Sequence, residues 1–161
     1  MKKYLFLLLA SAIVFTGCDK NSVDGRDAFV GTYEYVTEGE MTFSTFLPGV
    51  EPTLPLETEG TFKIEKLGAK DSVLVTGAMD GKLAPFKGIV KGSKLEFVQT
   101  DFNAQGKTFE VVMNIDNKVA TLANDTLTWS ANNVTCHGKF YEVEIEGDGH
   151  ITMKASKVRL K

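Results

Sequence analysis

Apolar and polar residues alternate through most of the chain after residue 28, in short runs separated by turn residues. In residues 107–115, for example, Phe109, Val111, Met113 and Ile115 stand at every second position. A spacing of two is typical of strands that bury one face, whereas an amphipathic helix needs spacings of three and four. No window of about a dozen residues shows the helical spacing. The sequence therefore predicts an all-β domain.

Short turns join the predicted strands, so strands consecutive in sequence should be antiparallel neighbours. Gly92-Ser93 is a two-residue hairpin loop, Asn124-Asp125 precedes another strand, and Gly147-Asp148-Gly149 is the predicted turn between the last two strands. With no helix to cover open edges, we expect closure into a barrel or a folded-over sandwich. The predicted strands cover residues 29–38, 40–47, 58–67, 71–78, 82–91, 94–100, 107–115, 118–124, 126–131, 134–146 and 149–160.

One connection is long and rich in proline. Residues 47–60, LPGVEPTLPLETEG, hold Pro48, Pro52 and Pro55, which cannot serve a central strand of a sheet. The segment is either a lid or rim over an opening, or a stiff surface crossover whose apolar side chains rest on the barrel wall.

The N-terminus has the pattern of an export signal. Lys2 and Lys3 precede an apolar run, Leu5–Phe15, that is shorter than the roughly 20 residues a membrane-spanning helix needs. The run ends at Phe15-Thr16-Gly17-Cys18, which resembles the lipobox of bacterial lipoproteins. The resemblance implies that residues 1–17 are a signal peptide and that Cys18 carries the lipid that anchors the protein to a membrane. It also implies a place in the cell envelope, expected at the outer membrane, on a face that the residues leave open.

Cleavage at Cys18 divides the chain into a lipidated flexible tether, residues 18–27, and one β-domain, residues 28–161. Loss of Lys2 and Lys3 takes the formal net charge from −3 to −5. No basic stripe remains that could follow a phosphate backbone, so nucleic acid is not an expected partner. A protein partner cannot be named from the residues.

The chain has no motif that marks a catalytic or metal site. It lacks a phosphate-binding glycine loop, His-Glu-x-x-His, Cys-x-x-Cys and Gly-x-Ser-x-Gly. His137 and His150 have no partners at the spacing of a catalytic triad. Cys136 is next to His137, but neighbours on a strand point to opposite faces, and free cysteine is usually buried. We therefore expect no catalytic residues, no metal and no cofactor, and we expect Cys136 to act as a small buried apolar residue.

The segment FVGTYEYV resembles the first strand of lipocalin-like, or calycin, domains, with Gly31 and Tyr33 at the places of that family's Gly-x-Trp. GTFKIEKLGAKDSVLVTG and ATLANDTLTWSA also resemble small lipocalin-like lipoproteins. The resemblance covers most of residues 28–160. It implies an antiparallel up-and-down meander that closes into a barrel of about 8–10 strands and can enclose a pocket.

Two functions remain open for such a barrel. One is a non-catalytic binding module that holds a small apolar or amphipathic ligand. The other is an envelope interaction or accessory protein whose barrel core is solid and holds no ligand. An apolar cavity of about 300 Å³ or more would favour the first. The residues predicted to line the pocket or the core are Tyr33, Phe43, Phe62, Phe97, Phe109, Trp129 and Arg159.

Arg159 has its place in this set because of the resemblance. In calycins an arginine on or just after the last strand packs across the first strand's aromatic ring, which here implies Arg159 over Tyr33, within about 6 Å of the ring. Arg159 is in phase with Ile151, Met153 and Ala155. The alternative is an exposed Arg159 in the C-terminal segment, with Val158 and Leu160 turned inward.

The anchor can be tested at the cysteine itself. Cys18→Ser should prevent incorporation of labelled palmitate and leave an uncleaved or slowly processed precursor, because serine has no sulfur to carry the diacylglycerol. Labelling of this variant at the wild-type level would refute the lipoprotein interpretation.

Overall fold

The computed structural model describes residues 24–44 and 52–159. The predicted signal peptide, Cys18 and the first part of the predicted tether therefore lie outside the described residues. Nearly all of the described chain is β-structure, with one short 3-10 helix, η1 (Gly25–Ala28). None of the helical structure in these ranges is long and apolar enough to cross a membrane.

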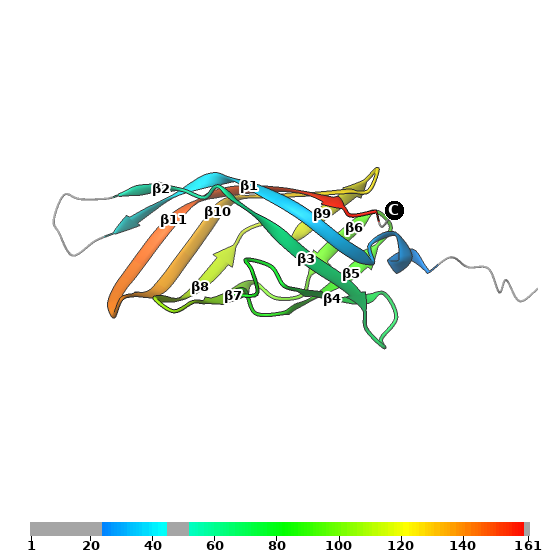
Figure 1. The fold of residues 1–161 in the computed structure, drawn as a ribbon, viewed down its shortest axis with the longest axis horizontal. Coiled ribbons are helices and arrows are strands. Elements are labelled where there is room, and N and C mark those ends of the chain that lie inside the picture. Colours follow the sequence, from blue (N-terminus) through cyan, green and yellow to red (C-terminus); the bar gives the residue numbers. More distant parts are fainter. Residues whose placement is uncertain (1–23, 45–51, 160–161) are drawn as a thin grey trace, which may run out of the picture.

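The strands form one antiparallel sheet that curls round on itself (Figure 1). They are β1 (Gly31–Ser44), β2 (Thr53–Pro55), β3 (Thr58–Lys66), β4 (Ser72–Thr76), β5 (Phe86–Lys91), β6 (Lys94–Phe97), β7 (Asp101–Gln105), β8 (Phe109–Ile115), β9 (Val119–Ala123), β10 (Thr126–Phe140) and β11 (Val143–Lys157).

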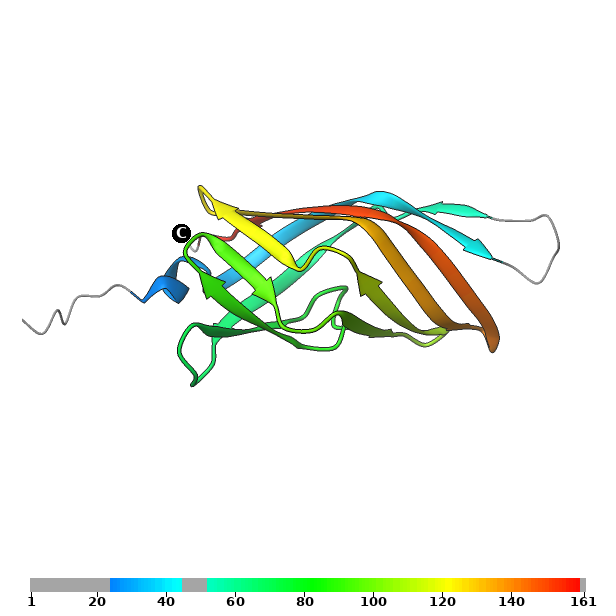
Figure 2. The ribbon, with the colours of Figure 1, turned by 180° about the vertical axis from the view of Figure 1, so that it is seen from behind.

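β8 and β9 are two parts of one interrupted strand, and so are β6 and β7. β8 and β9 both pair with β10 in a single register, in which Thr128 lies opposite Thr121 and Val134 lies opposite Ile115. β6 and β7 pair in the same way with β9 and β8. Figure 2 shows β8 and β9 following one another in line. The breaks between them are local, so the order of neighbours around the sheet follows the order of the sequence.

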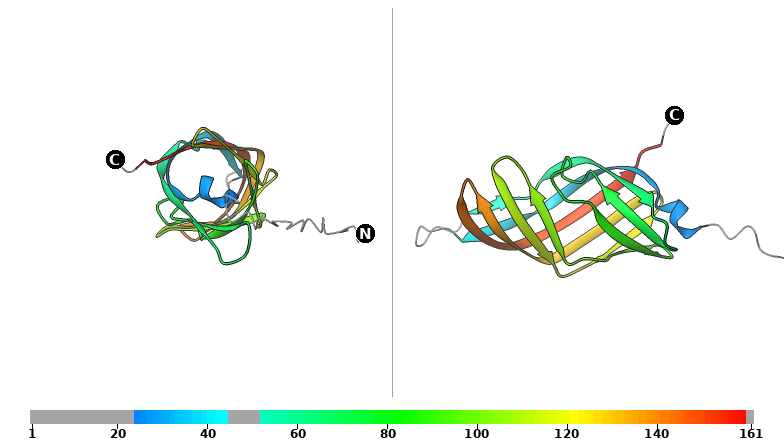
Figure 3. Two further views of the ribbon diagram at one scale, coloured as in Figure 1. Left: turned by 90° about the vertical axis from the view of Figure 1, so that its right-hand side faces the viewer. Right: turned by 90° about the horizontal axis from the view of Figure 1, so that it is seen from below.

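The ring closes between the first and last strands. β11 pairs with both β10 and β1, which gives a closed antiparallel barrel of eight strands, β1, β3, β4, β5, β6, β9, β10 and β11 (Figure 3). The predicted all-β class and the up-and-down meander closing into a barrel are confirmed.

The predicted turn at Gly147-Asp148-Gly149 is wrong. β10 and β11 run on to a tighter turn at Tyr141 and Glu142, both with positive φ (48° and 67°), as a two-residue hairpin loop of type I′ requires. Gly149 lies instead inside β11, opposite Met41. A Cβ atom there would overlap the carbonyl oxygen of Glu40, so this glycine allows two backbones to come close rather than making a turn.

The helix η1 plugs one end of the barrel (Figure 3). Its Arg26 side chain donates to the carbonyl oxygens of Leu67 and Ala69, at 2.7 and 2.9 Å, in the turn between β3 and β4. Asp24 accepts from Arg26 and pairs with Lys66, and these cations hold the pKa of its carboxyl well below the usual range. Residues 24–27 are therefore bound to the barrel and are not the flexible tether that was predicted for them.

Beneath the plug the barrel is solid. Phe29 follows η1 and is fully buried, and its carbonyl oxygen accepts a hydrogen bond from the Tyr33 hydroxyl at 2.9 Å. The Tyr33 ring stacks on Phe62, with centroids 5.3 Å apart. Burial is the main cause that raises the pKa of Tyr33 to about 12, so its hydroxyl stays a hydrogen-bond donor at neutral pH.

Loss of the Phe29 ring should destabilise this end. Truncating a buried phenylalanine to alanine typically costs about 3–5 kcal/mol, out of roughly 5–15 kcal/mol for a whole domain. Chemical denaturation of Phe29→Ala should show that loss, while Val36→Ala, on the outer face of β1, should unfold close to wild type. Coincident unfolding curves for Phe29→Ala and wild type would show that the plug does not stabilise the barrel.

Candidate functional site

The half of the barrel farther from η1 encloses an apolar cavity of about 510 Å³. It lies toward the end where β1 meets β2 and where the β10–β11 hairpin turns (Figure 1). This volume is larger than the roughly 300 Å³ above which a cavity favours a ligand-binding module over a barrel with a solid core. This cavity is the candidate functional site.

Strand alternation supplies most of the wall. Phe109, Val111, Met113 and Ile115 of β8 all line the cavity, as their spacing of two predicts. On β11, Ile145, Ile151 and Met153 line it, while Glu144 and Glu146 are exposed on the outer face. The inner and outer faces of these strands thus separate apolar from charged residues.

The predicted site residues divide between the cavity and other places. Phe43, Phe62, Phe97, Phe109 and Trp129 line the cavity. Tyr33 does not line it and belongs to the solid core under η1. The aromatic set therefore contributes both to a packed end and to a hollow one.

Arg159 is not placed as the calycin resemblance implies. β11 ends at Lys157, and the Arg159 guanidinium pairs with the carboxylate of Asp125 while 82% of the side chain stays exposed. Tyr33 is fully buried and lies opposite Lys157 in the β1–β11 register. The implied contact of Arg159 with Tyr33 is thus wrong, and the exposed alternative is what the structure shows. Val158 is not turned inward either, because it is 36% exposed.

The polar groups of the wall bond to other parts of the barrel. The Tyr35 hydroxyl accepts from the backbone N–H of Met79 at 3.1 Å, and the Trp129 indole donates to the carbonyl oxygen of Asn117 at 2.8 Å. The Thr37 hydroxyl bonds to Thr58 at 2.7 Å. Among the described residues, no ionisable carboxylate, amine or imidazole lines the cavity. Its inner surface therefore offers carbon and sulfur to a ligand.

All the sulfur atoms of the described residues gather on this wall. Met41, Met79, Met113, Met153 and Cys136 line the cavity, although the sequence marks none of these methionines by a motif. The Cys136 and Met41 sulfur atoms are 3.2 Å apart. Burial raises the pKa of the Cys136 thiol, and its neighbour in sequence, His137, is exposed on the outer face. Cys136 is thus the small buried residue that strand geometry predicts.

Two irregular segments complete the wall. Of the proline-rich connection, Pro52, Leu54 and Leu56 line the cavity, and β2 pairs with β1; residues 47–51 lie outside the described residues. The described part of this connection is therefore a rim of the opening. Residues 77–84, between β4 and β5, contribute Met79 and Leu83.

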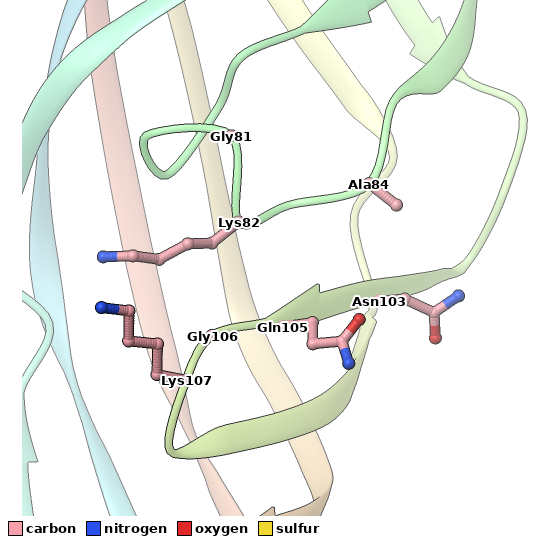
Figure 4. A pocket seen from close by; sticks show the side chains of 7 residues that line it. All are labelled: Gly81, Lys82, Ala84, Asn103, Gln105, Gly106 and Lys107. Atoms are coloured by element: carbon pink, nitrogen blue, oxygen red, sulfur yellow. The ribbon is translucent and has the colours of Figure 1, made fainter.

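Outside this wall lies a shallow polar hollow, lined by Lys82, Asn103, Gln105 and Lys107 among others (Figure 4). The segment around Lys82 is held there by β7. Leu83 pairs with Ala104, and the backbone N–H of Gln105 donates to the carbonyl oxygen of Lys82 at 2.9 Å. The hollow is thus separated from the cavity by one strand and the 77–84 segment.

Fold and site together define a closed, eight-stranded up-and-down β-barrel protein, plugged at one end and hollow and apolar toward the other. No known protein family matches the chain, and no curated protein matches it. A solved structure of the YwiB protein from Bacillus subtilis is similar to it at a TM-score of 0.31 and 8% sequence identity, over 80% of this chain and 94% of that one. A likeness of this size carries no argument about function.

Because Cys136 is buried, we expect its thiol to react slowly with reagents in solution. A thiol with a raised pKa has less of the reactive thiolate at a given pH, so in a Cys18→Ser chain the remaining Cys136 should react slowly with Ellman's reagent at pH 8. The rate should rise to that of an ordinary thiol once the protein is unfolded in urea. Equal rates in the folded and unfolded protein would contradict the placement of this side chain.

Proposed function

We propose that this protein is a non-catalytic binding module that holds a small apolar or amphipathic molecule in the cavity of its barrel. The single observation that carries the proposal is the cavity itself, at about 510 Å³ with an apolar wall. Ligand pockets usually measure about 300–1,000 Å³, and an apolar cavity of about 150 Å³ is already able to bind benzene.

The chemistry of the wall supports an apolar ligand. A polar ligand group placed inside would lose its hydrogen bonds to water, and the polar groups of the wall already bond to the barrel. An apolar group would gain contacts with side chains that otherwise face a void. The part of a ligand that enters the cavity is therefore hydrocarbon-like.

The methionines that line the cavity should let it accept ligands of different shapes. Their side chains are unbranched and polarizable, and they adapt to different neighbours more readily than branched residues do. Met41, Met113 and Met153 come from three different strands, so the wall can adjust on several sides. We infer a site that accepts a class of molecules rather than one compound.

The N-terminal residues support a location in the cell envelope for this binding module. An export signal over residues 1–17 and a lipid on Cys18 would hold the barrel in the cell envelope, expected at the outer membrane. A stable anchor needs more than one acyl chain, which the lipobox pattern implies. The barrel's up-and-down order agrees with the lipocalin-like resemblance of residues 28–160, which implies a barrel that can enclose a pocket.

Trp129 provides a direct test, because it is the only tryptophan of the chain and it lines the cavity. Decanol added to the purified protein should change the Trp129 emission and saturate at one molecule per chain. Val111→Phe, which adds volume to the wall, should weaken this binding about tenfold or more. Val36→Phe, on the outer face of β1, is the matched control and should bind as wild type does.

Overpacking can cost about 1–3 kcal/mol of stability, so circular dichroism must show that Val111→Phe is folded at the temperature of the titration. Failure of wild-type protein to bind decanol, fatty acids, bile acids or haem would reject the binding module. The envelope accessory protein without a ligand would then be the better account.

A further inference from the structure

The 77–84 segment fills a gap in the barrel wall. β4 pairs with β3 only as far as the pair Lys63–Thr76, so on that side the residues of β3 before Lys63 have no partner strand. The segment lies in this gap, between β3 and β7, and its residues Ala78, Met79 and Leu83 line the cavity. This part of the wall is therefore irregular backbone between two strands.

The segment is bonded firmly on the β7 side. The backbone N–H of Ala84 donates to the carbonyl oxygen of Asn103, and the N–H of Gln105 donates to the carbonyl oxygen of Lys82, both at 2.9 Å. Figure 4 shows Lys82 and Ala84 alongside these two residues of β7. Bonds of this kind are those that pair antiparallel strands, so this side of the segment is fixed to the sheet.

The β3 side of the segment is held more weakly. Within the described ranges, no backbone hydrogen bond joins residues 77–84 to β3, and the bond that holds this side runs from the Met79 N–H to the Tyr35 hydroxyl, at 3.1 Å. Tyr35 reaches across β3 because Gly60, its partner in the β1–β3 register, has no side chain. Phe62 on one side of this seam and Met79 on the other both line the cavity. The seam therefore separates the cavity from solvent.

Residues 77–81 form a turn with its own hydrogen bonds. The Gly81 N–H donates to the carbonyl oxygen of Ala78 at 3.1 Å, and Met79 and Asp80 both have positive φ (53° and 54°), as in a type I′ turn. Methionine and aspartate both pay a cost for positive φ, and such strain persists where the surrounding structure requires it, often at ligand sites. Here the strained turn places the Met79 side chain in the cavity wall.

We propose that residues 77–81 are a flap through which the ligand enters the cavity, and that the hydrogen bond between Tyr35 and Met79 holds the flap closed. This inference rests on the proposed function, to which it adds the route of the ligand. Breaking this one bond frees the seam between the flap and β3, while the two backbone bonds to β7 stay intact. The flap then turns outward as one unit, because its own hydrogen bonds are not broken.

Tyr35→Phe tests the route, because it deletes the closing hydrogen bond and keeps the ring. Loss of one such bond should favour the open flap about two- to tenfold. Stopped-flow measurement of Trp129 emission should then show decanol binding and leaving about two- to tenfold faster, with its Kd within about twofold of wild type. Both rates change alike because the same bond closes the flap before and after the ligand has entered.

Tyr33→Phe is the matched control. Tyr33 lies on the same strand, and its buried hydroxyl also bonds to a backbone group, the carbonyl oxygen of Phe29, but it lies in the solid core and does not line the cavity. Both decanol rates of Tyr33→Phe should equal those of wild type. Unchanged rates in Tyr35→Phe as well would mean that decanol passes the rim at residues 52–56, which would overturn the flap.

Amide hydrogen exchange tests the flap without any ligand. Relative to their intrinsic rates, the Met79 amide of wild type should exchange at least about tenfold faster than the amides of Ala84 and Gln105, because it is exposed each time the flap opens. In Tyr35→Phe the amides of Ala84 and Gln105 should keep their wild-type rates, since the β7 side stays bonded. A general loss of stability would instead speed all of these amides together.

The outcomes distinguish this inference from the proposed function. A Met79 amide as well protected as that of Gln105 would overturn the flap, while decanol binding to wild type upheld the cavity. Absence of decanol binding to wild type would overturn the binding module and the entrance together.

Discussion

β1 and β11 run side by side from the pair Tyr33–Lys157 to the pair Ser44–Glu146, without a break in register. Over the first part of this ladder they close an eight-stranded ring around a solid core. Over the last part they extend past β4, β5 and β6 and carry β2 and the β10–β11 hairpin. The cavity reaches into that extension, where residues 52–56 and the 77–84 segment complete a wall that is built mostly of paired strands. One continuous pairing therefore produces both the stable end and the hollow end.

The fold could be predicted from the sequence because alternation and turns are local signals. Phe109, Val111 and Met113 are spaced as on a strand, and they face inward. The error at Gly149 has a physical cause, because the same residue type serves turns and close backbone contacts. The true turn, at Tyr141 and Glu142, uses residues that disfavour positive φ. The long β10–β11 ladder fixes that turn, and a local signal cannot show a long-range pairing.

The candidate site could be predicted only in part. Phe62 and Tyr33 are equally aromatic and stack on each other, yet only Phe62 lines the cavity. The composition does not show which aromatic side chains are fully packed and which lie beside the cavity, because the cavity depends on how all the strands together close the barrel. Tyr35 and Met79 lie 44 positions apart and match no motif. They come together because the pairing of Leu83 with Ala104 holds the 77–84 segment in the wall, which no spacing in the sequence indicates.

The plug also sets an orientation. Asp24 is bonded to the plugged end, and only residues 19–23 separate it from Cys18. The six steps from Cys18 to Asp24 reach at most about 20 Å, whereas a strand as long as β11, at about 3.3 Å per residue, extends about 50 Å along its own direction. A barrel held by lipid at Cys18 would therefore stand with its plug toward the anchoring bilayer and its opening toward the aqueous side. A ligand would then enter and leave the cavity from the aqueous side. Transfer of the ligand into the anchoring membrane would require the whole barrel to reorient.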